Sequence, residues 1–175
     1  AELLFGPFEG RDISSKLLAK ESILLVQGLE QYFKSVRRLI LSHFDFIPAW
    51  QLDDVMGSVN YNPASCGAHF DQYDVFLLQH TGEKRWYFDE TVHCDDDLDE
   101  NSEIRLLKNF SPSSEIIARE GDLIYVPPGV GHHGLAEGKS ITLSVGIRNP
   151  TPIEILGDVS SFLMSELSHQ SPLSS

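Results

Sequence analysis

The sequence has few of the features that mark secreted or membrane-spanning proteins. Its 175 residues include only two cysteines, Cys66 and Cys94, and neither stands in a C-x-x-C pair. Neither a disulfide framework nor a zinc knuckle is therefore expected. No apolar run approaches the roughly 18 residues that a membrane-spanning helix needs, and no signal sequence is recognisable. We expect a cytoplasmic protein with two free thiols.

Positive charge is also scarce. Thirteen Lys and Arg residues stand against 26 Asp and Glu, which gives a net charge of −13. A chain of this sign repels phosphates, so direct binding of nucleic acid is not expected. The densest acidic run, HCDDDLDENSE at residues 93–103, is either a solvated loop or a docking surface for a basic partner.

The pattern that is present indicates one β-rich domain. The turn HTGE at residues 80–83 separates the apolar stretches at residues 73–79 and 84–88, which predicts a hairpin. Many short strands with Gly and Pro between them indicate a closed or two-sheet antiparallel fold. We expect strands at residues 23–26, 50–60, 73–79, 84–88, 115–118, 123–126 and 141–147.

Two stretches have the spacing of amphipathic helices. Apolar residues recur every three or four positions from Leu29 to Phe44, which predicts one helix packed on the core. A second pattern runs over residues 153–167, after Pro150 and Pro152. Its apolar face predicts docking, with a second copy of the chain as one candidate. Residues 1–22 are expected to form an irregular entry.

The segment HFDQYDVFLLQHTGEKRW, residues 69–86, carries the first candidate metal ligands. In an extended strand, side chains two positions apart point to the same face, so His69 and Asp71 would present an imidazole and a carboxylate together. A third ligand can come from PPGVGHHG at residues 127–134. A lone H-x-D is common, and a histidine after a turn often lies at the surface. Both motifs in order on a strand-rich pattern favour a metal site.

The second segment resembles the second motif of the cupin superfamily. In that motif a strand runs into a Pro-Gly turn and delivers a histidine into a β-barrel, and Gly121, Pro127, Gly129 and His132 stand at its spacing. His132 is therefore the third candidate ligand. His133, one residue further along, should point away.

His69 and Asp71 resemble the first cupin motif in spacing, with Asp71 in place of the second histidine. Two histidines and one carboxylate leave three coordination positions open on one side of a metal, as in non-haem Fe(II) oxygenases. The ligand set His69, Asp71 and His132 therefore predicts oxygen chemistry at Fe(II).

Such an oxygenase needs a further source of electrons, which 2-oxoglutarate supplies while it chelates the metal. Its far carboxylate needs a fixed cation. Lys84 lies on the strand behind the 80–83 turn and is the candidate, because Arg85 has the opposite parity; the alternative is an ordinary surface lysine. The polar strand positions expected to hydrogen-bond the cosubstrate are Ser58, Asn60, Thr142 and Ser144.

Three segments together, HFDQYDVFLLQHTGEKRW, GDLIYVPPGVGHHG and ITLSVGIRNP, resemble the Jumonji-C ribosomal oxygenases, and among them the bacterial branch that hydroxylates an arginine of a large-subunit ribosomal protein. The similarity extends from GPFEG at residues 6–10 to near Leu167. It implies a mainly β, double-stranded β-helix of the cupin or jelly-roll type with flanking α-helices. It also implies a 2-oxoglutarate-dependent dioxygenase that uses Fe(II) and O2, yields succinate and CO2, and acts on a basic ribosomal protein.

The resemblance gives the metal triad and Lys84 the roles stated above. It places the acidic position that receives the substrate side chain on Asp53, with Asp54 as the alternative, and Gln72 on the substrate side of the metal. A carboxylate suits a guanidinium, which it binds through paired, charge-assisted hydrogen bonds. Arginine and histidine hydroxylases share the iron and cosubstrate sites, so the hydroxylated residue stays open.

The resemblance also divides the chain. Residues 1–150 would form the catalytic domain with its N-terminal helix, and residues 151–175 the start of a helical, dimerisation-type region through which a homodimer would form. Family members carry a longer N-terminal segment and a C-terminal winged-helix-like domain, so a piece of a longer protein or a shortened member is expected. Two other functions stay open: a small-molecule cupin metalloenzyme that uses no 2-oxoglutarate, and a non-catalytic binding module of cupin fold.

Overall fold

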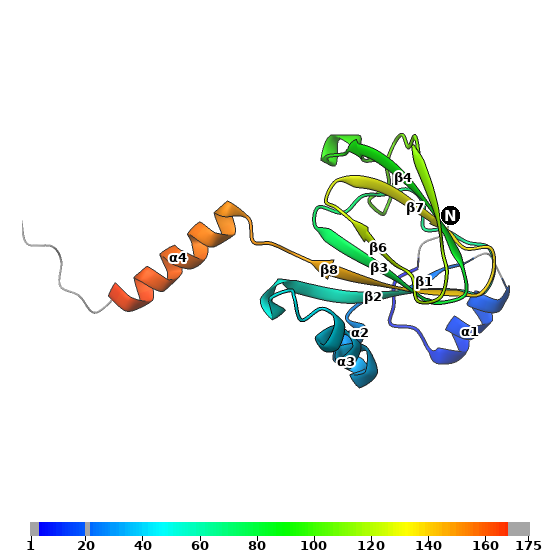
Figure 1. Cartoon of the computed structure of the whole chain (residues 1–175), viewed down its shortest axis with the longest axis horizontal. Coiled ribbons are helices and arrows are strands. Elements are labelled where there is room, and N and C mark those ends of the chain that lie inside the picture. Colours follow the sequence, from blue (N-terminus) through cyan, green and yellow to red (C-terminus); the bar gives the residue numbers. More distant parts are fainter. Residues whose placement is uncertain (1–3, 20–21, 168–175) are drawn as a thin grey trace, which may run out of the picture.

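The structure, a computed structural model, describes residues 4–19 and 22–167 (Figure 1). Two antiparallel sheets face each other, one with the strand order β1-β2-β8-β3-β6 and one with the order β5-β4-β7. The strands are β1 Leu24–Val26, β2 Leu52–Asn60, β3 Asp74–Thr81, β4 Lys84–Val92, β5 Ser114–Ala118, β6 Leu123–Val126, β7 Val130–Leu135 and β8 Ser140–Ile147. The predicted mainly β jelly roll is confirmed.

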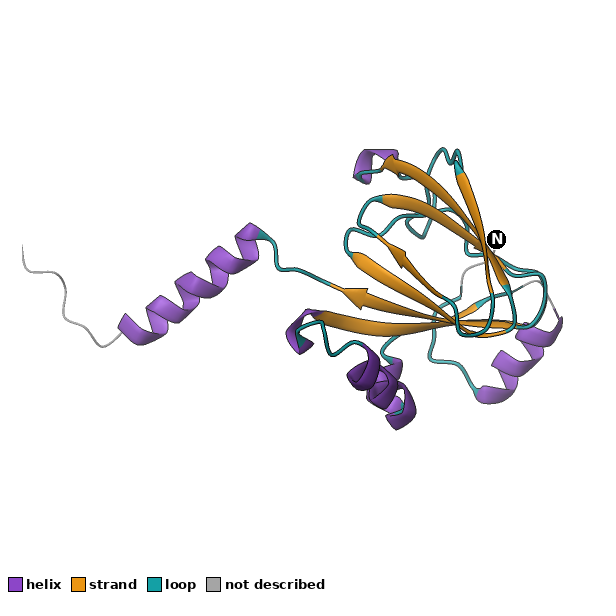
Figure 2. Cartoon of the chain, in the orientation of Figure 1, coloured by secondary structure: helices purple, strands orange, loops and turns teal. Residues whose placement is uncertain are grey.

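Helices flank the sheets, as Figure 2 shows. They are α1 Gly10–Ala19, α2 Leu29–Tyr32, α3 Lys34–His43 and α4 Pro152–Leu167, with short 3-10 turns η1 Ala49–Gln51 and η2 Asp95–Asp97. Helices α2 and α3 lie against the outer face of the larger sheet, where side chains of α3 join an apolar cluster with β2 and β8. Within the described residues, no helix has the length and apolar content to cross a membrane.

Two apolar clusters lie on opposite faces of the larger sheet, because successive strand residues point to opposite sides. The outer cluster, under α2 and α3, has the buried members Ile40, Phe44, Val55, Leu143 and Val145. The inner cluster, between the sheets, has the buried members Val75, Leu77, Trp86, Phe88, Ala118 and Val126. The inner faces of β2 and β8 are polar instead, so one side of the interior is apolar and the other can bind polar groups.

The predicted hairpin at residues 80–83 is wrong. Strand β3 pairs with β6 and β8, whereas β4 pairs with β5 and β7, so this turn carries the chain from one sheet to the other. Turn residues signal a reversal of the chain but not which sheet the next strand joins. Gly82 has φ +70°, and a Cβ there would lie 2.2 Å from the carbonyl oxygen of Lys139.

Three other expectations about local structure are corrected. The single helix predicted from Leu29 is two helices, because Phe33 between α2 and α3 is extended with φ −115° and ψ 107°. One extended residue hardly disturbs the apolar spacing, so the pattern does not reveal the break. Helix α1 occupies part of the stretch expected to be irregular, and β7 is a strand that the pattern did not predict.

Helix α4 confirms the helix predicted after Pro150 and extends away from the sheets (Figure 1). The rest of the predicted C-terminal region, residues 168–175, lies outside the described residues. The apolar side chains of α4 are exposed: Ile153, Ile155, Leu156, Val159, Phe162, Leu163, Met164 and Leu167.

The turn between the sheets gives a stability prediction. Gly82→Ala should lower the free energy of unfolding by about 3 kcal/mol, because alanine is strained at positive φ and its Cβ meets a backbone carbonyl. Gly138→Ala is the matched control: no atom lies within 4 Å of its added Cβ, so the change should stay within about 0.5 kcal/mol. Urea denaturation of both variants measures the difference, and equal stabilities would contradict the role given to Gly82.

Candidate metal centre

Three predicted ligands, His69, Asp71 and His132, lie together. One ligand atom of each is within 4.8 Å of the others. Nε2 of His132 is 3.6 Å from Oδ2 of Asp71, and the two imidazole centroids are 4.3 Å apart. Two nitrogens and one carboxylate oxygen at this separation could hold one divalent metal ion.

Backbone pairing brings these side chains together. His69 forms an isolated antiparallel bridge with His132 on β7: its N–H donates to the His132 carbonyl at 3.0 Å, and the reciprocal bond is 2.8 Å. The N–H of Gly129 donates to the carbonyl of Asp71 at 2.8 Å. The H-x-D segment therefore pairs with the start of β7 through this short bridge and precedes β3, which begins at Asp74.

The outer nitrogen of each imidazole faces a backbone carbonyl. Nδ1 of His69 is 3.0 Å from the Gly67 oxygen, and Nδ1 of His132 is 3.1 Å from the Val130 oxygen. A carbonyl only accepts, so Nδ1 is expected to carry the ring proton when either imidazole is neutral, and Nε2 is then the nitrogen that can bind a metal. This orientation, together with the donor set, fits the predicted divalent iron.

The two histidines differ in their electrostatic environment. Burial lowers the pKa of His132 to about 3, and the charge of His69 adds to that shift. Burial acts in the same direction on His69, but hydrogen bonds to Cys66 and the Gly67 carbonyl and the charge of Asp71 raise its pKa to about 9. A histidine binds a metal only in its neutral form, so metal binding would release a proton from His69.

His133 lies on the other face of β7, as predicted. Its ring contacts Tyr87 and Phe110, with centroid distances of 6.2 and 6.0 Å. It is not part of the group of metal-ligand atoms found among the described residues. The alternation of a strand thus separates two adjacent histidines into an inner and an outer one.

Lys84 is buried, with 3% of its surface exposed, so the alternative of a surface lysine is excluded. Its ammonium donates to Oγ of Ser58 at 3.1 Å and lies 5.0 Å from the centre of the Trp86 ring. Burial lowers its pKa. Among the described residues, no carboxylate forms an ion pair with it. A buried cation without a counter-charge is unfavourable and provides a site for an anion.

The other predicted cosubstrate positions share this inner face. Ser58 lies opposite Thr142, and Met56 lies opposite Ser144, on the paired strands β2 and β8. Ser58, Asn60 and Thr142 are buried, whereas Ser144 is partly exposed. The sequence pattern did not single out Gln79 on β3, which is buried and accepts the Thr142 hydroxyl. The sequence signal that could have identified Gln79 is a polar residue on the same face of the strand as the apolar Val75 and Leu77.

Comparison with known proteins decides the family. The sequence profile described as the JmjC domain matches residues 39–155. The chain belongs to the JmjC domain family. A probable ribosomal oxygenase of Haemophilus influenzae is 35% identical over 163 residues, covering 91% of this chain and 39% of the relative. A ribosomal protein uL16 3-hydroxylase of Escherichia coli is 32% identical over 162 residues, covering 91% and 41%.

A solved structure of similar fold is that of YcfD, a ribosomal oxygenase from Escherichia coli, in complex with cobalt and 2-oxoglutarate. Its TM-score is 0.76 at 29% identity, and the match covers 97% of this chain and 42% of that chain. This JmjC chain therefore spans about two fifths of the length of the relatives it matches.

Two acidic residues, Asp53 and Asp54, lie at one end of the space between the two sheets, beside the triad. We call this end the acidic mouth. A bulge between Leu52 and Val55 places Asp53 and Asp54 near Gly146: a Cβ on Gly146 would lie 3.6 Å from Cβ of Asp53 and from Oδ1 of Asp54. Asp53 is exposed, and Asp54 is half-buried and accepts the Gly28 N–H at 3.4 Å. The choice between the two stays open.

Tyr73 joins this acidic mouth and was not singled out from the sequence. Its ring would lie 3.2 Å from a Cβ on Gly146. Burial and the charges of Asp71, Asp54 and Asp53 raise its pKa to about 12. The phenol therefore stays neutral among carboxylates, and the group as a whole would attract a cation.

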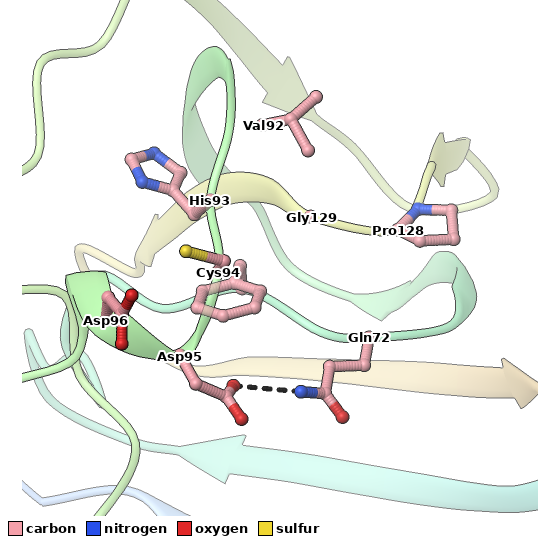
Figure 3. Close-up of a pocket in the computed structure, with 9 residues that line it drawn as sticks. Gln72, Val92, His93, Cys94, Asp95, Asp96, Pro128 and Gly129 are labelled. Atoms are coloured by element: carbon pink, nitrogen blue, oxygen red, sulfur yellow. Dashed lines mark hydrogen bonds between the residues drawn. The ribbon is translucent and has the colours of Figure 1, made fainter.

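Gln72 faces a separate surface pocket of about 520 Å³ (Figure 3). Its amide donates to Oδ1 of Asp95 at 2.8 Å, and Arg105 donates to the same oxygen at 2.6 Å. Phe70 and Gln72, which line the pocket, alternate with the two candidate ligands of the H-x-D segment. Gln72 follows Asp71 in the chain, but none of the three candidate ligands lines this pocket, and its place on the substrate side of the metal stays a prediction.

The triad gives a metal-binding prediction. His132→Ala should abolish stoichiometric binding of Fe(II) or Co(II), because one of three ligands is lost. His133→Ala removes the neighbouring imidazole on the outer face and should retain binding. Metal content after anaerobic gel filtration measures both. Equal loss in the two variants would contradict the assignment of His132.

Proposed function

We propose that residues 1–150 are the catalytic domain of an Fe(II)- and 2-oxoglutarate-dependent oxygenase that hydroxylates an amino-acid side chain of a large-subunit ribosomal protein. The observation that carries the proposal is the pairing of a His-Asp-His triad with a buried cation, Lys84, between the same two sheets. The names of the relatives, a uL16 3-hydroxylase and a ribosomal oxygenase with bound 2-oxoglutarate, support the same reading.

His69, Asp71 and His132 would hold the iron. When bound, iron supplies the reaction of O2 with 2-oxoglutarate, which gives succinate, CO2 and the oxygen atom inserted into the substrate. Lys84 would bind the far carboxylate and so fix the direction in which the cosubstrate lies. Its burial makes this ion pair stronger than a surface pair, because little water competes for the charges.

We further propose that the modified residue is an arginine. A guanidinium would be attracted to the acidic mouth, where Asp53 and Asp54 lie beside Tyr73. The net charge of −13 suits a basic ribosomal protein as the partner. The absence of direct nucleic-acid binding and a cytoplasmic location remain predictions.

We also propose that α4 packs against a second copy of the chain. Its apolar residues are exposed on all sides, including Leu156, Phe162 and Met164, and they belong to the residues for which the family resemblance implies a dimerisation-type region. Burial of such a surface is favourable at about 25 cal/mol per Å². Dimerisation would leave the metal centre unobstructed, since α4 extends away from the sheets (Figure 1).

The proposed enzymatic function can be tested directly with a variant of Lys84. Purified protein with Fe(II), 2-oxoglutarate, O2 and large-subunit ribosomal proteins should yield succinate and a gain of one oxygen on an arginine, read by mass spectrometry. Lys84→Ala should weaken 2-oxoglutarate binding on the order of 100-fold, because the buried counter-charge is lost.

Lys139→Ala is the matched control, since Lys139 is exposed and contacts only the ring of Tyr61 among the interactions described for its side chain. It should leave 2-oxoglutarate binding unchanged. A gain of oxygen without succinate, undiminished in Lys84→Ala, would instead favour a cupin metalloenzyme that uses no 2-oxoglutarate. If neither succinate nor a gain of oxygen is detected with any ribosomal protein, the remaining interpretation is a non-catalytic binding module of cupin fold.

The acidic mouth gives a prediction for substrate binding. Asp53→Asn and Asp54→Asn each remove a negative charge, and the one that contacts the substrate should raise KM for an arginine peptide about tenfold. The other should change KM by less than about threefold. Formation of succinate without peptide should be retained in both, because neither residue contacts the triad. An unchanged KM in both variants would contradict the proposal that the acidic mouth binds a guanidinium.

A further inference from the structure

The acidic run at residues 93–103 contacts the segment that carries two of the metal ligands. In the H-x-D segment, Phe70 and Gln72 alternate with the two ligands, and they line a surface pocket together with the first residues of the run. The sequence left two interpretations of this run, a solvated loop or a docking surface. Its contacts with the H-x-D segment indicate a third.

These contacts lie on both sides of the two ligands. Oδ1 of Asp95 accepts the amide of Gln72, the residue after the second ligand, at 2.8 Å (Figure 3). Just after the run, the N–H of Leu107 donates to the carbonyl of Ala68, the residue before the first ligand, at 2.9 Å. The H-x-D segment is therefore held at both ends by one stretch of chain.

His93, the first residue of the run, contacts both segments that carry ligands. Its ring is stacked on that of Phe70, with centroids 6.1 Å apart and planes at 29° to each other. Its N–H donates to the carbonyl of Gly129 at 2.8 Å, and the N–H of Gly129 donates to the carbonyl of the ligand Asp71. On β7, one residue before the third ligand, a Cβ on Gly131 would lie 3.0 Å from two atoms of the His93 ring. The imidazole thus packs against the H-x-D segment and β7 at once.

Two carboxylates face the nitrogens of this ring. Nε2 of His93 is 3.3 Å from Oδ2 of Asp89, and Nδ1 is 3.7 Å from Oδ2 of Asp97. Nε2 has no hydrogen bond among the described residues, so its contact with Asp89 is electrostatic. The His93 side chain is only 9% exposed, and little water competes for these contacts. Carboxylates on both nitrogens favour one orientation of the ring, the one in which it lies against Phe70.

Backbone hydrogen bonds fix the two carboxylates. Asp89 accepts the N–H groups of Thr91 and Ser111, each at 3.1 Å. Asp97 accepts the N–H of Cys94 at 2.9 Å. None of these bonds involves the imidazole, so a substitution that removes the ring leaves them in place. The carboxylates therefore orient the ring, and their own positions do not depend on it.

We propose that His93, held by Asp89 and Asp97, is a positioning residue that fixes the H-x-D segment relative to β7 and thereby sets the geometry of the three metal ligands. This inference rests on the proposed function, because it takes the triad as the metal centre. It gives the start of the acidic run a role that neither a solvated loop nor a docking surface requires. Groups that orient metal ligands without touching the ion typically change metal affinity by about 10- to 100-fold.

Titration of the full chain with Co(II), followed by visible absorption, tests the proposal, because the absorption bands of Co(II) report the geometry of its ligands. His93→Gln removes the ring that packs on Phe70 and Gly131 and keeps a polar side chain. It should weaken Co(II) binding about tenfold and shift the bands at saturating Co(II). His133→Gln is the matched control, since it removes the adjacent imidazole on the outer face of β7. It should leave affinity and bands unchanged.

Asp97→Asn provides a milder arm, which decides if thermal unfolding shows that His93→Gln is not folded. Its amide oxygen can still accept the N–H of Cys94, but the charge that faces the ring is lost. It should weaken Co(II) binding about threefold. Asp96→Asn removes the same charge from the same turn, and the Asp96 carboxylate has no hydrogen bond or ion pair among the described residues. This control should bind Co(II) as the wild type does.

The outcomes separate the inference from the proposed function. Weaker binding with shifted bands in His93→Gln supports the inference, provided that His133→Gln behaves as the wild type. Wild-type affinity and bands in His93→Gln overturn it, as does equal loss in the two variants. Lower thermal stability with unchanged bands also overturns it, because that result shows a structural role alone. A wild-type chain that binds no Co(II) overturns the proposed function, and the inference with it.

Discussion

The interior depends on one constraint: the ammonium group of Lys84 is enclosed between two sheets, and no carboxylate of the described residues forms an ion pair with it. Burying such a charge costs several kcal/mol unless polar partners replace water. The hydroxyl of Ser58 and the face of the Trp86 ring offset part of that cost. The glycine at position 134 leaves room for both side chains, since a Cβ there would lie 2.8 Å from a ring carbon of Trp86 and 2.9 Å from Cε of Lys84. Of the polar residues on the inner faces of β2 and β8, Ser58 contacts this charge directly.

The two ends of the interior have opposite electrostatic character. Along β2, Ser58 marks the end where Lys84 lies, and Asp53 and Asp54 mark the other end, beside the triad. An anionic cosubstrate and a cationic substrate would thus be drawn to different ends of the same space. The triad lies at the acidic end, where a carboxylate ligand, Asp71, and the neutral phenol of Tyr73 complete the mouth.

The short motifs led to the three residues of the triad, which lie together, and strand parity singled out the buried Lys84 over Arg85. Prediction from the sequence failed where the outcome depends on contacts between distant segments. The turn at Gly82 joins two sheets rather than two strands of one, and the extended Phe33 divides a regular apolar pattern. The sequence could name Thr142 as polar but could not show that Gln79 takes its hydrogen, since hydrogen-bond direction depends on which acceptors surround the amide.

The backbone bridge between His69 and His132 has a consequence for the entropy of metal binding. The two residues are far apart in the chain, and the folded backbone, through two reciprocal hydrogen bonds, closes the loop between them. The conformational cost of bringing the ligands together is therefore met during folding and not by the incoming ion. The centre is pre-organised, so removal of the metal should leave the fold intact, unlike in small zinc modules that unfold without their ion.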